Sequence, residues 1–226
     1  KDPFSYQLSQ GAMSAAERLD ADLCIFPGKY IGVDYERYND QARYEYQYNA
    51  LFDIAAAAEF DYIISAVGSI AYPVDNEGKK RHLEIFGKTP ILSVAAKIDG
   101  YDYLMFDNRT GIMQAVEHLV KEQGKKCIGM LCGDLNSSEC VERFEAYRTA
   151  LEKNGLPYDP KLVVPSDISD NIYKEAGRLV DNNPEIDAVI CVNDIMAQTL
   201  YTVLNDRGIH IGRDIAVTGF DDLPFA

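Results

Sequence analysis

Residues 190–224 read ICVNDIMAQTLYTVLNDRGIHIGRDIAVTGFDDLP, and the pattern of this stretch is the strongest indication of the fold class. Two apolar runs border or lie within it, Ala188–Val192 and Ile215–Val217, and each stops abruptly at polar residues. Between them Gly208 is placed to end a helix whose apolar face consists of Met196, Leu200, Val203 and Leu204. Buried strands joined by a helix are typical of a parallel α/β sheet.

The polar residues that follow the two runs predict a small-molecule site, because open α/β sheets bind ligands at the carboxyl ends of their strands. Asn193 follows the first run and Asp221 the second. A carboxamide and a carboxylate fixed at strand ends can exchange hydrogen bonds with vicinal hydroxyls. We interpret their neighbours, Asp194 and Asp222, as helix caps.

Strand and helix patterns alternate along most of the chain, which favours parallel sheets flanked by helices. The break at Ala95–Tyr103, where two strands follow each other without a helix, indicates two lobes joined by a crossover. The expected strands are Asp22–Phe26, Tyr62–Ser65, Pro90–Val94, Leu104–Phe106, Cys127–Leu131, Leu162–Val164 and the two runs above. The expected helices include 5–19, 112–120, 138–153 and 171–181, and residues 66–69 are expected as a turn.

Arg143 lies inside the predicted helix 138–153. Its guanidinium could clamp a ligand oxygen, or it could pair with Glu139 or Glu142 on the same helix. Spacing alone leaves both interpretations open. Asp107 or Asn108 is placed to cap the helix that follows.

Composition excludes several classes of function. Acidic residues outnumber basic ones 36 to 22, giving a formal net charge of −14, which repels phosphate backbones. No run of eighteen apolar residues could span a membrane. The five cysteines contain no C-x-x-C pair, which favours reduced thiols in a cytosolic protein over a disulfide framework or a metal site. The three histidines match no catalytic motif, so we predict no catalytic residue, no metal and no cofactor.

Three segments together resemble the effector-binding core of the LacI/GalR family. They are FDNRTGIMQAVEHLVKEQGKKCIGMLCGD, RFEAYRTALEKNGL and the stretch quoted first. The resemblance implies an α/β, periplasmic-binding-protein-like (type I) fold of two Rossmann-like lobes that close on a ligand. The lobes would comprise residues 1–106 and 107–226. The first strand and the C-terminal return segment of the first lobe would lie outside this sequence.

The same resemblance implies the site residues. Arg143, Asn193 and Asp221 would hydrogen-bond the ligand, Asp2 would match an Asn-Pro-Phe-type element of the first lobe, and Phe4 would pack on the ligand. The chain departs from the family at Ala95-Ala96, where Asp-Arg is common, and at Ile168, near the usual aromatic. These departures favour a less hydroxylated or different effector as an alternative to a common sugar.

The function implied is a cytoplasmic, non-enzymatic sensor of a small sugar-like molecule in a bacterial transcriptional regulator. Such a chain would form a homodimer and reach DNA only through a domain outside this sequence. The alternatives are a sensor attached to another output, such as a diguanylate cyclase, and a periplasmic solute-binding protein. A glycoside-acting enzyme would need two carboxylates facing each other at catalytic separation. The tyrosine-rich segment Tyr30–Tyr48 is interpreted as a partly exposed loop and helix face.

Overall fold

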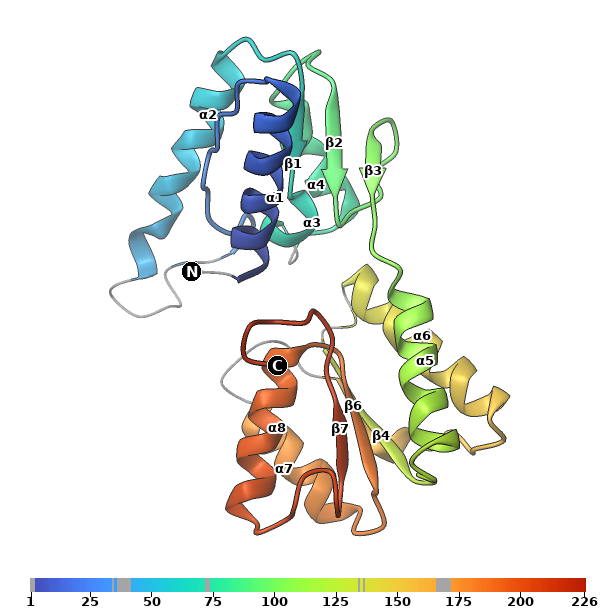
Figure 1. Ribbon diagram of the computed structural model, residues 1–226. Coiled ribbons are helices and arrows are strands. Elements are labelled where there is room, and N and C mark those ends of the chain that lie inside the picture. The colour runs from blue at the N-terminus through green and yellow to red at the C-terminus, as the bar shows by residue number, and fades with distance from the viewer. Residues whose placement is uncertain are drawn as a thin grey trace. The chain divides into compact units, whose positions relative to one another are not determined.

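The computed structural model describes residues 3–33, 35, 42–71, 74–133, 135, 137–165 and 172–226. The chain divides into two compact units, Lys1–Phe106 and Asp107–Ala226. Each unit contains one parallel sheet flanked by helices (Figure 1). The predicted α/β class with parallel sheets is therefore confirmed.

The first unit has a three-stranded sheet in the order β1-β2-β3. Its core joins α2, α3 and α4 to β2, through side chains that include Ala55, Val67, Leu83 and Ile91. Asp75 caps α4 by accepting a hydrogen bond from the Gly78 amide. In chain order the elements are α1 (Pro3–Leu19), the 3-10 helix η2 (Ala42–Asn49), α2 (Ala50–Ala57), β1 (Ile63–Ser65), α3 (Val67–Ile70), α4 (Asn76–Glu84), β2 (Ile91–Val94) and β3 (Asp102–Leu104).

Two expectations for the first unit are wrong. Residues 22–26 form no strand; the Leu23 and Ile25 side chains are exposed, and no described strand pairs with the segment. A short apolar run forms a strand only where a neighbouring backbone satisfies its hydrogen bonds. Residues 66–69, expected as a turn, form most of the one-turn helix α3, whose Val67 is fully buried.

The exposure of the tyrosine side chains partly confirms the interpretation of the tyrosine-rich segment as an exposed surface. Tyr44, Tyr46 and Tyr48 on η2 are each about half exposed. Lys29 lies over the ring of Tyr48, 5.7 Å from its centroid, and also pairs with Glu45. Tyr35, in contrast, is buried. Of the six tyrosines, Tyr38 lies outside the described residues.

His82 gives the first unit a pH-dependent stability. Its ring lies between Phe52 and Phe86 of the same core, with centroids 5.0 and 5.8 Å away, and burial holds its pKa below the ordinary value. As the pH is lowered, His82 therefore takes up a proton at a higher pH in the unfolded chain than in the folded one. Its contribution to the free energy of unfolding is complete above a pH of about 6.5 and decreases as the pH falls below that value. We expect the urea concentration at the unfolding midpoint of the wild-type chain to decrease as the pH is lowered from about 7.5 to about 5.

His82→Phe is expected to weaken this pH dependence, because the substituted ring cannot take up a proton. His118→Gln is the matched control, since His118 lies on the exposed face of a helix in the second unit. Equal slopes of unfolding free energy against pH for wild type and His82→Phe would contradict the assignment.

The second unit has a four-stranded parallel sheet in the order β5-β4-β6-β7. Helices α5 and α6 cover one face and α7 and α8 the other (Figure 1). Its elements are α5 (Asn108–Lys121), β4 (Ile128–Gly133), α6 (Ser138–Lys153), the 3-10 helix η3 (Pro160–Leu162), β5 (Val163–Pro165), α7 (Ile172–Asn182), β6 (Ala188–Cys191), α8 (Asp194–Asp206) and β7 (Ala216–Thr218).

The continuous apolar run of β6 follows from burial on both faces. Ala188 and Ile190 pack towards α5 and α6, whereas Val189 and Cys191 pack towards α7 and α8. All four side chains are fully buried. A strand covered on only one face would alternate with polar residues instead, so the sequence pattern reports the three-layer arrangement.

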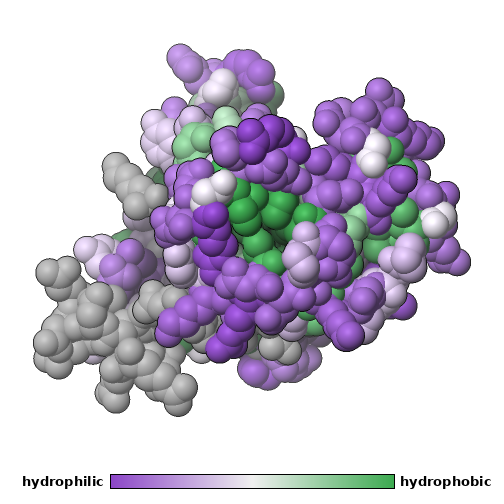
Figure 2. Space-filling model, turned by 90° about the horizontal axis from the view of Figure 1, so that it is seen from below, coloured by the Kyte–Doolittle hydropathy of each residue, from purple (hydrophilic) through white to green (hydrophobic). Residues whose placement is uncertain are grey.

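The face of the chain seen in Figure 2 is largely hydrophilic. Figure 2 shows, from below, hydrophilic residues around a smaller hydrophobic area. Among the described helices none is both long and apolar enough to cross a membrane. Within the same residues no group of three or more His, Cys, Asp or Glu could hold a metal ion, and Cys24, Cys127, Cys132 and Cys191 have free thiols.

Candidate functional site

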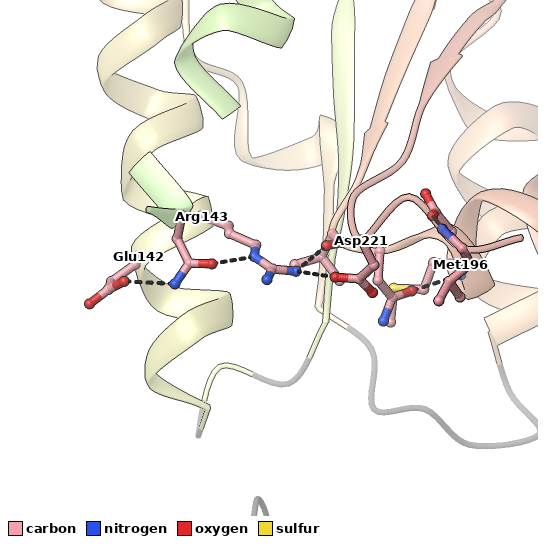
Figure 3. Close-up of polar contacts among 9 residues, drawn as sticks. Glu142, Arg143, Met196 and Asp221 are labelled. Carbon is pink, nitrogen blue, oxygen red and sulfur yellow. Dashed lines mark hydrogen bonds and ion pairs between the residues drawn. The ribbon is translucent and has the colours of Figure 1, made fainter. Parts of the chain in front are cut away.

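The candidate site lies at the carboxyl-end edge of the second unit's sheet. The strands β4, β6 and β7 run parallel, so the segments that follow them meet at the same edge. Asn193 follows β6, and Asp221 lies in the loop after β7. Arg143 reaches the same edge from α6, as Figure 3 shows. The fold therefore brings together three of the five residues that the sequence singled out.

Arg143 is almost fully buried and is held by groups from three different segments. Its Nε donates to the Oδ1 atom of Asn108 at 2.8 Å, and its Nη1 donates to the carbonyl oxygen of Val192 at 2.6 Å. The guanidinium carbon lies 3.8 Å from the centroid of the Phe220 ring, which is a cation–π contact. The alternative pairing with Glu139 or Glu142 is absent from the described contacts of Arg143.

Asn108 orients the arginine through a second hydrogen bond of its own. It is buried in the first turn of α5, and its Nδ2 donates to the Oε2 atom of Glu142 at 2.9 Å. Because the carboxylate accepts from Nδ2, the carboxamide presents Oδ1 to Arg143. The helix cap at this point is Asp107, which accepts from the Thr110 amide at 2.9 Å. This hydrogen bond also lowers the pKa of Asp107.

Asp221 is the most accessible group of the site. Its side chain is 36% exposed, and its Oδ1 lies 3.8 Å from Nη1 of Arg143. Asp221 and Asp222 both have positive φ, 105° and 53°, a region that residues other than glycine seldom occupy. Such strain persists only where surrounding contacts impose it, and it is frequent at ligand sites.

The structure assigns the cap of α8 to Asn193 and not to Asp194, whereas the ligand contact predicted for Asn193 stays a prediction. The cap of α8 is Asn193, whose Oδ1 accepts from the Met196 amide at 2.9 Å. Asp194 is the first residue of α8, and its buried Oδ2 accepts from the Leu223 amide at 2.8 Å. Asp222 is exposed in the loop after β7 and begins no described helix. The interpretation of Asp194 and Asp222 as helix caps is therefore wrong.

The side-chain oxygen of Asn193 accepts the capping hydrogen bond, and its Nδ2 is the remaining polar atom of the side chain, a hydrogen-bond donor. Neither this atom nor Nη2 of Arg143 donates a hydrogen bond within the described part of the chain. These two donors lie at the same edge as the Asp221 carboxylate, which is an acceptor group and is partly accessible to solvent. This arrangement can bind a small molecule that carries neighbouring hydroxyl or carbonyl groups.

Comparison with known proteins shows what the part of the chain that carries this site is similar to. A model of the periplasmic binding protein-like domain matches residues 116–226. The regulator CelR of Thermobifida fusca is 35% identical over 121 residues, which cover 53% of this chain and 35% of CelR. The chain is homologous to the effector-binding domains of the LacI/GalR family.

Solved structures of LacI/GalR proteins extend the likeness to both units. A complex of CelR with cellobiose matches 85% of this chain and 54% of that chain, with a TM-score of 0.63 and 25% identity. The lactose repressor matches 98% of this chain and 76% of that chain, with a TM-score of 0.71 and 20% identity, which supports the fold alone. The curated relatives are transcriptional regulators, in agreement with the expectation of a non-enzymatic domain.

The first unit holds the remaining candidates of the LacI/GalR pattern. Phe4, at the start of α1, packs edge-on against Phe106 with ring centroids 5.7 Å apart. It is partly buried, so the contact with the ligand that the family pattern implies stays a prediction. Asp2 and Ile168 lie outside the described residues.

Sequence reasoning missed two residues of the site. Asn108 was considered only as a cap, and Phe220 was not singled out, although it directly precedes Asp221. A signal for Phe220 was present, because an aromatic beside a candidate arginine can stack on it. The role of Asn108 had no local signal, since its partner Arg143 lies 35 residues further along the chain.

Proposed function

We propose that this chain is the effector-sensing part of a LacI-type transcriptional regulator. It would bind a small sugar or sugar-like molecule at the carboxyl-end edge of the second sheet. The observation that carries the proposal is the fixed position of Arg143, whose guanidinium is held by Asn108 and Val192 and stacked on Phe220. A buried arginine with one uncommitted nitrogen beside an exposed carboxylate is suited to recognise vicinal hydroxyls.

In this proposal each group has a distinct task. Nη2 of Arg143 and Nδ2 of Asn193 donate to ligand oxygens, and Asp221 accepts from ligand hydroxyls. Because Arg143 is already oriented before the ligand arrives, little conformational entropy is lost there on binding. Phe4 and Asp2 would add contacts from the first unit, as the family pattern implies.

The output of the sensor would lie in a domain outside this sequence. The matched relatives are named as helix-turn-helix regulators, and the chain spans 35% of the length of CelR. The negative charge of −14 disfavours direct contact with DNA, so DNA would be bound by that other domain. The regulator would be cytoplasmic and homodimeric, and the effector would act by binding one conformation more tightly than another.

The proposal is tested by thermal shift of the purified chain against libraries of mono- and disaccharides, including cellobiose, and of nucleosides and amino acids. A ligand that binds raises the melting temperature with increasing concentration. Cellobiose is included because the related CelR structure contains it. If no compound in the three libraries shifts the transition, the sensor function is wrong.

Asp221→Asn is expected to weaken binding of the ligand found in this screen roughly tenfold to a hundredfold, because a charged acceptor becomes a neutral one. Asp222→Asn is the matched control, since it makes the same change at the next residue of the loop. Affinities are measured by isothermal titration calorimetry. Equal losses for the two variants would show that the carboxylate of Asp221 has no specific role.

A further inference from the structure

We propose that Asp194 is a positioning residue for the ligand site, which holds the loop after β7 so that Asp221 lies beside Arg143. The proposal rests on the function proposed above and identifies what fixes the site's most accessible group. Asp194 itself is buried and does not reach the surface that would bind the ligand.

The backbone and the side chain of Asp194 each form a hydrogen bond with the loop after β7. Its amide donates to the carbonyl oxygen of Phe220 at 2.9 Å, and its Oδ2 accepts from the amide of Leu223 at 2.8 Å. Asp221 and Asp222 lie between these two anchors. The loop is therefore fixed on both sides of the residue that contacts Arg143.

A close approach at Gly219 supports the same conclusion. A Cβ atom added at Gly219 would lie 2.0 Å from Oδ1 of Asp194. The loop thus passes directly against the carboxylate, so that only glycine fits at this point. Leu223, at the far end, is buried and anchors the loop from the other side.

The conformation of the loop requires such a support. Two consecutive residues other than glycine have positive φ there, Asp221 at 105° and Asp222 at 53°. A free loop would relax towards ordinary backbone angles, and Asp221 would leave its place near Arg143. No capping role accounts for the buried carboxylate, because Asn193 already caps α8. The positive end of the α8 helix dipole stabilises the negative charge of the Asp194 carboxylate, since Asp194 is the first residue of this helix.

Hydrogen–deuterium exchange tests the proposal without any ligand. In Asp194→Ala the amides of residues 219–226 are expected to exchange roughly tenfold faster or more, the factor for loss of one charge-assisted hydrogen bond, while those of β4 and β6 keep their protection. Asp194→Asn is expected to have a smaller effect, because its carboxamide oxygen can still accept from Leu223. Asp206→Asn, at the other end of α8, removes the same charge and should leave the loop unchanged.

Unchanged exchange of the loop in Asp194→Ala would overturn the proposal. Equal acceleration throughout the second unit would also overturn it, since that result indicates a general structural role.

Binding separates a positioning role from a structural one. With cellobiose as the probe, Asp194→Ala and Asp221→Ala are expected to weaken affinity by similar factors, and the double variant by no more than the larger factor. Additive losses would mean that Asp194 does not act through Asp221. If cellobiose does not bind the wild-type chain, that result counts against a sugar effector, and the exchange experiment alone decides the role of Asp194.

Discussion

Arg143→Ala is expected to abolish ligand binding and to lower the free energy of unfolding by about 3 kcal/mol. The substitution leaves the buried Val192 carbonyl and the Asn108 carboxamide without their donor. It also opens a space against the ring of Phe220. Arg143→Lys should recover part of the stability but little of the binding, because a single ammonium nitrogen cannot occupy the separate positions of Nε, Nη1 and Nη2 in the planar guanidinium.

Arg148→Ala is the matched control for this prediction. Arg148 is on the same helix, but it is exposed and pairs with Glu145 at the surface. Removing an exposed ion pair changes stability by about 0–1 kcal/mol. Urea unfolding gives the stability of each variant and calorimetry its affinity. Similar losses for Arg143→Ala and Arg148→Ala would show that burial and the three contacts of Arg143 contribute little.

Gly68→Ala is expected to destabilise the first unit by about 2–4 kcal/mol. A Cβ atom at this position would lie 2.1 Å from the carbonyl oxygen of Ala95 and 2.3 Å from its carbonyl carbon. Both are backbone atoms, and Ala95 is itself buried with a φ of 60°. Helix α3 must therefore move away from the end of β2, since no side chain can rotate to relieve the clash.

Gly11→Ala is the opposite test of the same substitution. Gly11 lies in the middle of α1, and a Cβ atom there would meet nothing within 4 Å. Alanine is the better helix former, so this variant is expected to stabilise the chain by about 0.5–1 kcal/mol. Both variants are compared with wild type by urea unfolding. If they changed stability in the same direction, the steric explanation for Gly68 would be wrong.

The sequence predicted regular elements well where hydrophobic periodicity extended over several turns and ended at a helix-terminating residue such as glycine. The helix Ser138–Lys153 has the predicted limits, and Gly155 follows it with a φ of 72°, as expected for a helix end. The strand predicted at 22–26 does not form, because a short apolar run does not specify a partner strand. Local pattern reports propensity and burial, whereas strand formation also depends on a neighbour.

For the site, the sequence together with the family resemblance supplied the candidate residues but not their geometry. Asn193 and Asp221 were identified at strand ends and Arg143 on the helix 138–153, and the fold brings all three to one edge of one sheet. Which oxygen each of them uses was not predictable, because hydrogen bonding depends on groups that are distant in the chain. Asp2 lies outside the described residues, and the ligand contact of Phe4 stays a prediction.

The order of strands and helices in the second unit, the burial of β6 on both faces and the residue types at the strand ends could be predicted from the sequence alone. Hydrophobic periodicity and turn chemistry act over a few residues, so they can be read locally. Only the tertiary structure decided that Asn193, rather than Asp194, caps α8, and that Asp194 instead holds the loop of Asp221. It also decided that Asn108 and the Val192 carbonyl fix Arg143. Apart from the cap of α8, which is local, these contacts join residues 29 to 49 positions apart, and only the packing of helices against the sheet brings such residues within hydrogen-bonding distance.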